Sequence, residues 1–332
     1  MTAALQNKKI LITGGAGFIG SHLVEKCLQE KAGLVRVMDN FSTGFRANLE
    51  GLSAFPAFEL LEGDIRDFET CRRACAGVDI VFHQAALGSV PRSIQDPLTT
   101  HAVNADGFLN MMHAAREAGV RHFIYASSSS VYGDNEDLPK REEKTGNPLS
   151  PYALTKALNE KYAEVFHRCY GFRSVGLRYF NVFGPRQDPQ GPYAAVIPRF
   201  IFRCLAGDPL EIYGDGSIER DFTYVDNVIH ANLLSLQDEK LPGCTVFNVG
   251  CGTSASILSL AQKVKALYEE ATGQPSRSDI EFCPPRPGDI LRSEASIENI
   301  RSRLGYEPLV SMDEGLRRTL RWFIGKKTPA TV

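Results

Sequence analysis

The sequence contains no long apolar run and no excess of charge of either sign. None of its apolar stretches approaches the roughly 20 residues that a helix needs to cross a bilayer, and residues 1–9 are polar without the pattern of a secretion signal. Lys and Arg number 37 against 39 Asp and Glu, for a formal net charge of −2. We therefore expect neither a membrane nor nucleic acid as a partner, and an anionic ligand must be held locally by a few arginines or helix N-termini.

Cysteine pairs with the spacing of metal sites or redox motifs are missing. The eight cysteines are scattered, and no two of them form a CxxC pattern. Unpaired thiols are typical of the reducing cytoplasm, so we expect a cytoplasmic protein with neither a disulfide framework nor a metal site. The residues are Cys27, Cys71, Cys75, Cys169, Cys204, Cys244, Cys251 and Cys283.

Short apolar runs alternate with helical patterns over the first half of the chain. This alternation predicts a doubly wound α/β fold, in which right-handed crossovers place helices on both faces of a parallel sheet. The length of 332 residues suggests about two domains. The predicted strands are residues 9–13, 35–39, 58–62, 80–84, 122–127 and 174–179, and the predicted helices include 19–29, 97–118 and 151–170.

A glycine-rich turn joins the first predicted strand to the first predicted helix. Gly14, Gly17 and Gly20 are spaced as GxxGxxG, which allows a tight turn and lets backbone N–H groups approach a pyrophosphate at the helix N-terminus. Asp39 ends the second predicted strand, about 20 residues further on. An acid at this place accepts hydrogen bonds from the adenosine ribose and repels a 2′-phosphate. We therefore predict a Rossmann domain that binds NAD rather than NADP.

The regular alternation ends near residue 180. Residues 184–193 are rich in Pro, Gly and Gln and are expected to form a loop. We expect an NAD-binding Rossmann domain over residues 1–180 and a smaller, mixed α/β substrate domain over 181–332. The boundary is interleaved, because segments near 222–250 are expected to return to the first domain, with 223–225 and 245–249 as candidate strands of its sheet.

Tyr152 and Lys156 form a YxxxK pair at the start of a predicted helix. Ser150 and Pro151 are typical of a helix start, and the i, i+4 spacing places both side chains on one face. Four serines, residues 127–130, end the fifth predicted strand, and strand C-termini in this fold open onto the ligand crevice. A phenol with a pKa of about 10 is a weak base at neutral pH, but the Lys156 ammonium and an oxidised nicotinamide both favour the phenolate. The pair is therefore suited to removing an alcohol proton while NAD accepts a hydride from the same carbon.

Together these motifs resemble the extended short-chain dehydrogenase/reductase family over nearly the whole chain. The resemblance is carried by residues 14–20, 39–40, 63–65, 83–86, 127–133, 152–156 and 178–181. It implies Ser128, Tyr152 and Lys156 as catalytic residues, with Ser129 as the alternative serine because four serines in a row blur the register. The cofactor residues that it implies are Gly14, Gly17, Phe18, Ile19, Gly20, Asp39, Asn40, Ser42, Thr43, Gly44, Asp64, Ile65, Gln84, Ala85, Ala86, Asn104, Ser127, Tyr152, Lys156 and Phe180.

Within this family the chain is similar to the UDP-sugar 4-epimerases. The similarity implies Arg220 and Arg286 as a clamp on the UDP pyrophosphate, a role that suits guanidinium groups. It also implies Asp289 at the ribose and Tyr213 near the uracil. The implied substrate residues are Gly88, Ser89, Ser128, Ser129, Asn181, Gln187, Ala195, Val196, Tyr213, Arg220, Arg286, Asp289 and Ser293.

The similarity also carries an expectation about the sugar. Epimerases that prefer N-acetylated sugars are similar to this chain at Gly88, Ser89, Asn181, Gln187, Ala195 and Ser293. Where members restricted to non-acetylated sugars have a bulky residue, the small Ser293 would leave room for a 2-acetamido group. We therefore expect reversible interconversion of UDP-N-acetylglucosamine and UDP-N-acetylgalactosamine. Oxidation at C4 would be followed by rotation of the bound 4-keto sugar and return of the hydride to its other face.

Other activities remain open at this point. A UDP-glucose 4-epimerase and a UDP-glucuronate or UDP-N-acetyluronate 4-epimerase (or decarboxylase) share the oxidation, and a non-catalytic NAD-binding sensor is a remote alternative. A nucleotide-sugar 4,6-dehydratase is disfavoured, because that group has Asp-Glu after the catalytic serine where Ser129 and Ser130 stand here. The resemblance also implies a homodimer packed through the helices at 97–118 and 151–170.

Overall fold

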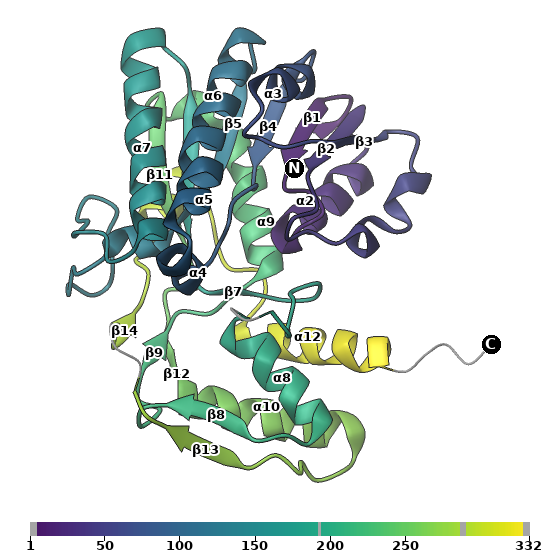
Figure 1. Ribbon diagram of the computed structural model, residues 1–332, viewed down its shortest axis with the longest axis vertical. Coiled ribbons are helices and arrows are strands. Elements are labelled where there is room, and N and C mark those ends of the chain that lie inside the picture. Colours follow the sequence, from purple (N-terminus) through teal and green to yellow (C-terminus); the bar gives the residue numbers. More distant parts are fainter. Residues whose placement is uncertain (1–4, 192–193, 286–289, 328–332) are drawn as a thin grey trace.

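A seven-stranded parallel sheet forms the centre of the larger lobe (Figure 1). The computed structural model describes residues 5–191, 194–285 and 290–327. The strand order is β11-β6-β5-β4-β1-β2-β3, and every neighbouring pair is parallel. The order reverses direction beside β1, so the carboxyl ends of β1 and β4 form the switch point at which such sheets bind ligands. The strands are β1 (Lys9–Thr13), β2 (Leu34–Asp39), β3 (Phe58–Glu62), β4 (Ile80–His83), β5 (His122–Ser128), β6 (Ser174–Tyr179) and β11 (Cys244–Val249).

Helices cover both faces of this sheet, which confirms the predicted doubly wound α/β fold. Leu11 packs with α3, α6 and α7 on one face, whereas Ile10 and Ile12 pack with α2 and α9 on the other. All three side chains are fully buried, as expected for a central strand covered on both faces. The helix predicted over 97–118 is divided into α5 and α6 by a π-helical turn, Ala102–Asp106. The helices are α2 (Phe18–Gln29), α3 (Phe68–Cys75), α4 (Val90–Gln95), α5 (Pro97–His101), α6 (Gly107–Glu117), α7 (Pro151–Tyr170) and α9 (Val225–Leu234).

A smaller mixed lobe lies beyond the carboxyl edge of the large sheet (Figure 1). It contains a two-stranded parallel sheet, β13-β8, and a three-stranded sheet, β12-β9-β14. Helices α8, α10 and α12 pack against one another beside them. The elements are α8 (Val196–Ala206), β8 (Leu210–Tyr213), β9 (Glu219–Arg220), β12 (Ala255–Ser256), α10 (Ile257–Thr272), β13 (Ile280–Cys283), β14 (Arg292–Ser293) and α12 (Met312–Lys327). Helix α11 (Glu298–Leu304) instead packs against β11 at the edge of the large sheet.

Only one of the two late segments expected in the large sheet lies there. Residues 245–249 belong to β11, which pairs with β6 at the sheet edge. The prediction for residues 223–225 is wrong, because β10 (Thr223–Tyr224) pairs with β7 (Val182–Phe183) in a separate two-stranded sheet. The chain turns out of the large sheet at Asn181, whose φ of 30° is left-handed, and the partner of β10 therefore lies outside that sheet.

The described ranges hold neither a membrane-spanning helix nor a metal cluster. No helix within them is both long and apolar enough to cross a bilayer. In the same ranges, no group of three or more His, Cys, Asp and Glu side chains could hold a metal ion. All eight cysteines are free.

Candidate active site

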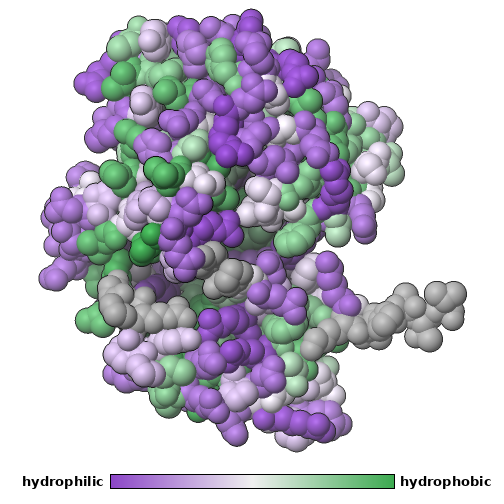
Figure 2. Space-filling view, in the orientation of Figure 1, coloured by the Kyte–Doolittle hydropathy of each residue, from purple (hydrophilic) through white to green (hydrophobic). Residues whose placement is uncertain are grey.

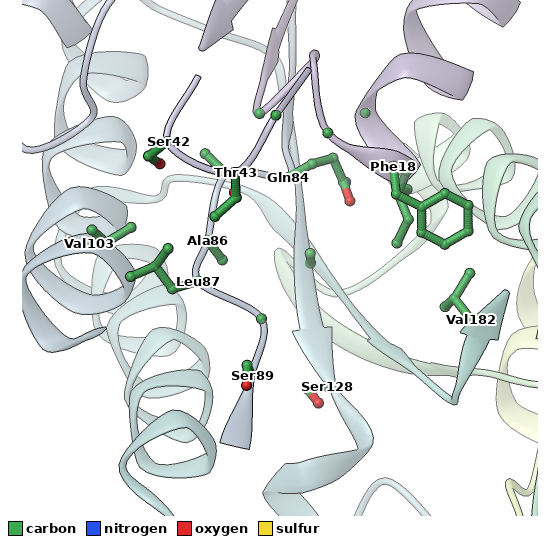
Figure 3. Close-up of a pocket in the computed structure, with 18 of the residues that line it drawn as sticks. Phe18, Ser42, Thr43, Gln84, Ala86, Leu87, Ser89, Val103, Ser128 and Val182 are labelled. Atoms are coloured by element: carbon green, nitrogen blue, oxygen red, sulfur yellow. The ribbon is translucent and has the colours of Figure 1, made fainter. Parts of the chain in front are cut away.

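A cavity of about 600 Å³ opens at the carboxyl edge of the large sheet. Its walls are the loops that follow β1, β2, β3 and β4, together with the end of β5, the start of α7 and the segment that follows β6. The surface is hollowed between the larger and the smaller lobe (Figure 2). Within the cavity, Ser42 and Thr43 lie at one end of the view, and Ser89 and Ser128 lie at the other (Figure 3).

The glycine turn after β1 packs closely against neighbouring backbone at the N-terminus of α2. Gly14 has a φ of +68°, and a Cβ there would lie 2.8 Å from the Cα of Ala85. A Cβ on Gly20 would lie 2.1 Å from the carbonyl oxygen of Gly14. No side chain caps α2 at Gly17, and the first residues of this helix line the cavity. These features fit an anionic ligand at a helix N-terminus.

Asp39 lies at the end of β2 with its carboxylate held by backbone amides. The amide of Ala16 donates to Oδ2 at 2.9 Å, and the amide of Phe41 donates to Oδ1 at 2.8 Å. Burial raises the pKa of Asp39, while these hydrogen bonds oppose that shift. Each oxygen keeps a lone pair that can accept a hydroxyl.

Tyr152 and Lys156 lie on the first two turns of α7. The Ser150 hydroxyl caps this helix by accepting from the amide of Ala153 at 3.1 Å, and Pro151 is its first residue. The Lys156 ammonium donates to the carbonyl of Ala126 at 2.7 Å. Burial lowers the pKa of Lys156 to about 8. The α7 helix therefore carries a cation next to a phenol at the cavity wall.

Ser128 is the serine that contacts the phenol. Burial raises the pKa of Tyr152, and a hydrogen bond with the Ser128 side chain opposes that shift. The Ser128 hydroxyl also accepts from the amide of Ser130 at 3.1 Å, which starts the short helix Ser129–Tyr132. Ser129 lines the same cavity, but the contact with Tyr152 favours Ser128 for the catalytic role.

The structure brings all but two of the predicted cofactor residues to the cavity wall. Asn104 is the first exception, because it is only 1% exposed and fastens the loop after β4 instead. Its Oδ1 accepts from the amide of Leu87 at 2.8 Å, and its Nδ2 donates to the Leu87 carbonyl at 3.2 Å and to Thr155 Oγ1 at 3.3 Å. Phe180 is the second exception, because its side chain is fully buried in the core.

The predicted substrate residues divide between the cavity and the smaller lobe. Those that line the cavity are Gly88, Ser89, Ser128, Ser129, Asn181, Gln187 and Ala195. Val196, Tyr213, Arg220 and Ser293 are not part of its wall. Ser293 on β14 is the register partner of Arg220 on β9, so these two predicted residues are adjacent in space. Arg286 and Asp289 lie outside the described residues.

Arg186 is a cavity residue that the sequence reasoning missed. It has a φ of +66°, which is strained for a non-glycine residue. Its Nη2 pairs with Glu25 Oε2 on α2 at 2.5 Å, and its Nη1 is buried without a partner among the described residues. An arginine next to Gln187 in a Pro- and Gly-rich loop after a central strand was the available signal, because such loops border the crevice.

The motif set and the fold agree with comparisons against known proteins. The model of the NAD dependent epimerase/dehydratase family matches residues 10–250. UDP-glucose 4-epimerase from Mycolicibacterium smegmatis is 38% identical over 320 residues, which cover 96% of this chain and 99% of that protein.

Solved structures share the whole architecture. A UDP-N-acetylglucosamine 4-epimerase from Methanobrevibacter ruminantium, in complex with UDP-N-acetylmuramic acid, is 38% identical and superposes with a TM-score of 0.89, covering 97% of this chain and 99% of that one. The UDP-glucose 4-epimerase of Thermus thermophilus in complex with NAD is 37% identical, with a TM-score of 0.83 and coverage of 96% and 99%.

Proposed function

Because the chain belongs to the NAD-dependent epimerase/dehydratase family, we propose that it is a UDP-sugar 4-epimerase that interconverts UDP-N-acetylglucosamine and UDP-N-acetylgalactosamine. The observation that carries this proposal is the composition of one cavity. Its wall holds the glycine turn and Asp39 together with Tyr152, Lys156 and Asn181. The cavity can therefore hold a dinucleotide and a reacting sugar next to each other.

The residues present fit NAD at the first of these places. Gly14 and Gly20 allow the turn to pack closely on neighbouring backbone, which a Cβ at either position would strike. The pyrophosphate is assigned to the N-terminus of α2, where Gly17, Phe18 and Ile19 line the cavity. The Asp39 carboxylate is assigned to the adenosine ribose, and Asp64 and Ile65 lie on the wall for the adenine. When bound there, NAD accepts a hydride from C4 of the sugar and later returns it.

Tyr152 is proposed to act as the base and then as the acid. Its phenolate would remove the proton of the C4 hydroxyl and return it after the sugar has turned. The Lys156 ammonium, held by the carbonyl of Ala126, favours that phenolate by charge. The Ser128 hydroxyl, which contacts Tyr152, would orient the sugar and donate to the oxygen as charge develops.

Inversion requires the oxidised sugar to present its other face. Small side chains at the sugar end of the cavity, Gly88, Ser89 and Ala195, leave space for a hexose to rotate. The UDP moiety must stay fixed meanwhile, and the smaller lobe with Arg220 is assigned to it. Binding energy would thus lie mainly on the nucleotide.

The preference for N-acetylated sugars rests on Ser293. This residue lies beside Arg220 in the β9-β14 pair, and its small side chain would leave room for a 2-acetamido group. The similarity to a UDP-N-acetylglucosamine 4-epimerase over 97% of the chain supports the same assignment.

A second candidate is a UDP-uronate 4-epimerase, and Arg186 favours it. The side chain of this arginine lines the cavity and is 20% exposed, with a buried Nη1 that has no partner among the described residues. A guanidinium there could pair with a sugar carboxylate. The ion pair with Glu25 already neutralises much of its charge, so the N-acetyl assignment is preferred.

Purified protein offered a panel of UDP-sugars, with the products separated by NMR, tests the function. We expect turnover of UDP-N-acetylglucosamine to exceed that of UDP-glucose and UDP-glucuronate, without stoichiometric NADH. Accumulating NADH would indicate a dehydrogenase instead, and faster turnover of UDP-glucuronate would select the second candidate. A protein that is inactive on every UDP-sugar of the panel would reject the proposed epimerase activity.

We also propose that two copies pack through α5 and α7. Leu98 on α5 and Leu154 on α7 are 82% and 58% exposed, and Ile94 on the neighbouring α4 is 63% exposed. Apolar side chains lie among polar ones on this part of the larger lobe (Figure 2). Such a patch on a face with no other role is typical of a subunit interface. The free cysteines suit the cytoplasm, which we propose as the compartment.

A further inference from the structure

A buried ion pair lies directly behind the Tyr152–Lys156 pair. Glu160 follows Lys156 by one turn of α7, and Arg178 comes from the neighbouring strand β6. Arg178 Nε donates to Glu160 Oε1 at 2.9 Å, and Nη2 donates to Oε2 at 2.8 Å. The two residues are only 7% and 4% exposed. Neither belongs to the cavity wall, so the pair does not serve as a substrate contact.

Two residues of α7 hold two consecutive residues of β5. The Lys156 ammonium donates to the carbonyl of Ala126 at 2.7 Å, and the Ser127 hydroxyl donates to Glu160 Oε1 at 2.5 Å. Ser128, the residue that contacts the phenol, is the next one along the strand. The position of the Glu160 carboxylate therefore fixes the end of β5 from behind.

Glu160 is also the anion that opposes the cost of burying the Lys156 charge. Burial lowers the pKa of Lys156 to about 8, and the negative charge of Glu160 acts against that shift. The neighbouring His83 adds no competing charge, because burial lowers its pKa to about 3. The other ionisable groups around the two side chains are Tyr125, Tyr132, Glu142, Tyr152, Glu164, Arg178 and Cys244.

Arg178 keeps this carboxylate in place through a wider network. Its Nη1 donates to the Tyr132 hydroxyl at 2.9 Å, which in turn donates to Asn248 Oδ1 at 2.6 Å. Burial raises the pKa of Tyr132 to about 12, so the phenol stays neutral. Both oxygens of Glu160 thus accept from Arg178, and the carboxylate cannot turn away from the catalytic helix.

We propose that Glu160 is a positioning residue of the epimerase reaction: its carboxylate places a negative charge one helical turn behind the Lys156 ammonium and holds the strand end that carries Ser128. This inference rests on the proposed function. A purely structural buried pair would stabilise the fold without altering the charge of Lys156.

The direct test is an NMR titration of Lys156 in the full-length protein with its NAD. Protein labelled at the Cε of lysine gives the Lys156 signal, which is identified by its loss in Lys156→Arg. In Glu160→Gln we expect the midpoint to fall by roughly one pH unit, because an opposite charge has been removed at close range. Glu164→Gln is the matched control, since it makes the same change one turn further along α7 at a side chain that is 47% exposed. An unchanged midpoint in folded Glu160→Gln would overturn the proposal.

Two further variants separate the charge from the fold. Glu160→Asp keeps the charge, so it should preserve the Lys156 midpoint even where stability falls. Glu160→Gln leaves Arg178 buried without its anion, which is strongly destabilising. If that variant does not fold, Glu160→Gln combined with Arg178→Gln removes both charges. Its midpoint should still fall, but by less than in the single variant, because the loss of the Arg178 cation acts in the opposite direction. A double variant whose midpoint equals or exceeds that of the wild type would reject the proposal.

Kinetics on UDP-N-acetylglucosamine supply the second readout. In Glu160→Gln, the basic limb of the pH profile of kcat should move to lower pH. KM should change by less than about threefold, because the Glu160–Arg178 pair does not touch the substrate. A parallel loss at every pH would indicate a structural role only. A wild type inactive on all UDP-sugars would reject the proposed function, and the Lys156 titration would still decide the effect of Glu160.

Discussion

The cofactor side and the proposed substrate side of the site differ in how their residues are brought together. On the cofactor side, Gly14 and Gly20 belong to one turn, and Tyr152 and Lys156 belong to two turns of one helix. On the substrate side, Ser293 reaches Arg220 only through the pairing of β14 with β9. Local backbone geometry brings the cofactor residues together, whereas the proposed substrate residues are brought together by the packing of distant segments.

This difference separates chemistry from selectivity. Under the proposed function, the turn and the helix act on NAD and on one alcohol carbon, which every such sugar nucleotide presents. The smaller lobe is assigned to the groups that distinguish one sugar nucleotide from another. Changes on the cofactor side should therefore impair all substrates alike, and changes on the substrate side should alter the ratio between them.

The largest effect is expected for Tyr152→Phe. Removing the phenol oxygen deletes the proposed proton transfer, a step commonly worth about 10²–10⁴ in rate. Turnover of UDP-N-acetylglucosamine and of UDP-glucose should fall by the same factor, while the fold and bound NAD are kept. Steady-state kinetics with a measurement of retained NAD checks this. Near-normal turnover in the folded variant would remove Tyr152 from the mechanism.

The same difference explains which parts of the site could be predicted from sequence. The spacing of Gly14, Gly17 and Gly20 and the i, i+4 spacing of Tyr152 and Lys156 have direct geometric meaning, so the structure places them as expected. The strand pattern likewise predicted the large sheet and the return of residues 245–249 to it.

The sequence was least informative where side-chain direction or strand partners decide. The side chain of Asn104 is hydrogen-bonded to the backbone of Leu87 and does not line the cavity. The side chain of Phe180 is buried in the hydrophobic core. Residues 223–225 have the apolar pattern of a strand, but the pattern does not name the partner, which is β7. The conformation of Arg186, with its positive φ, likewise has no signature in a single sequence.

A smaller but more selective effect is expected for Ser293→Tyr. If this residue borders the 2-acetamido group, an aromatic ring there overfills the space, which costs about 1–3 kcal/mol in packed sites. A penalty of about 2 kcal/mol on one substrate shifts the ratio of kcat/KM values roughly 30-fold. UDP-N-acetylglucosamine should lose that factor, and UDP-glucose should be spared.

The matched comparison is Ser293→Ala, which keeps the space and should leave the ratio within about twofold. Both variants are assayed on both substrates under identical conditions. Equal losses on both substrates in Ser293→Tyr would mean that the change damages the site without reading the acetamido group. The substrate side would then lack its proposed selectivity residue.

The smallest effect is a pH dependence that the cofactor side imposes on every substrate. Lys156 supports the Tyr152 phenolate only while it is charged, and its pKa in the folded protein is about 8. At pH 9 such a group is about one-tenth protonated, so turnover should be about a fifth of that at pH 8. Lys156→Arg, which keeps its charge at both values, should lose this decline if it is active.

Partial unfolding at pH 9 would also lower the turnover. The pH dependence of the stability of the protein distinguishes unfolding from the loss of the Lys156 charge. The pKa of Lys156 rises from about 8 in the folded protein to its usual 10.5 in the unfolded chain. Between these values the unfolded chain binds more protons at this residue, so its contribution to stability increases as the pH rises through that window. Denaturant midpoints measured at pH 8 and pH 9 should therefore show no loss attributable to Lys156 while turnover falls. A decline that differed between UDP-N-acetylglucosamine and UDP-glucose would contradict the division, because a group acting on the phenol cannot distinguish a substituent at C2.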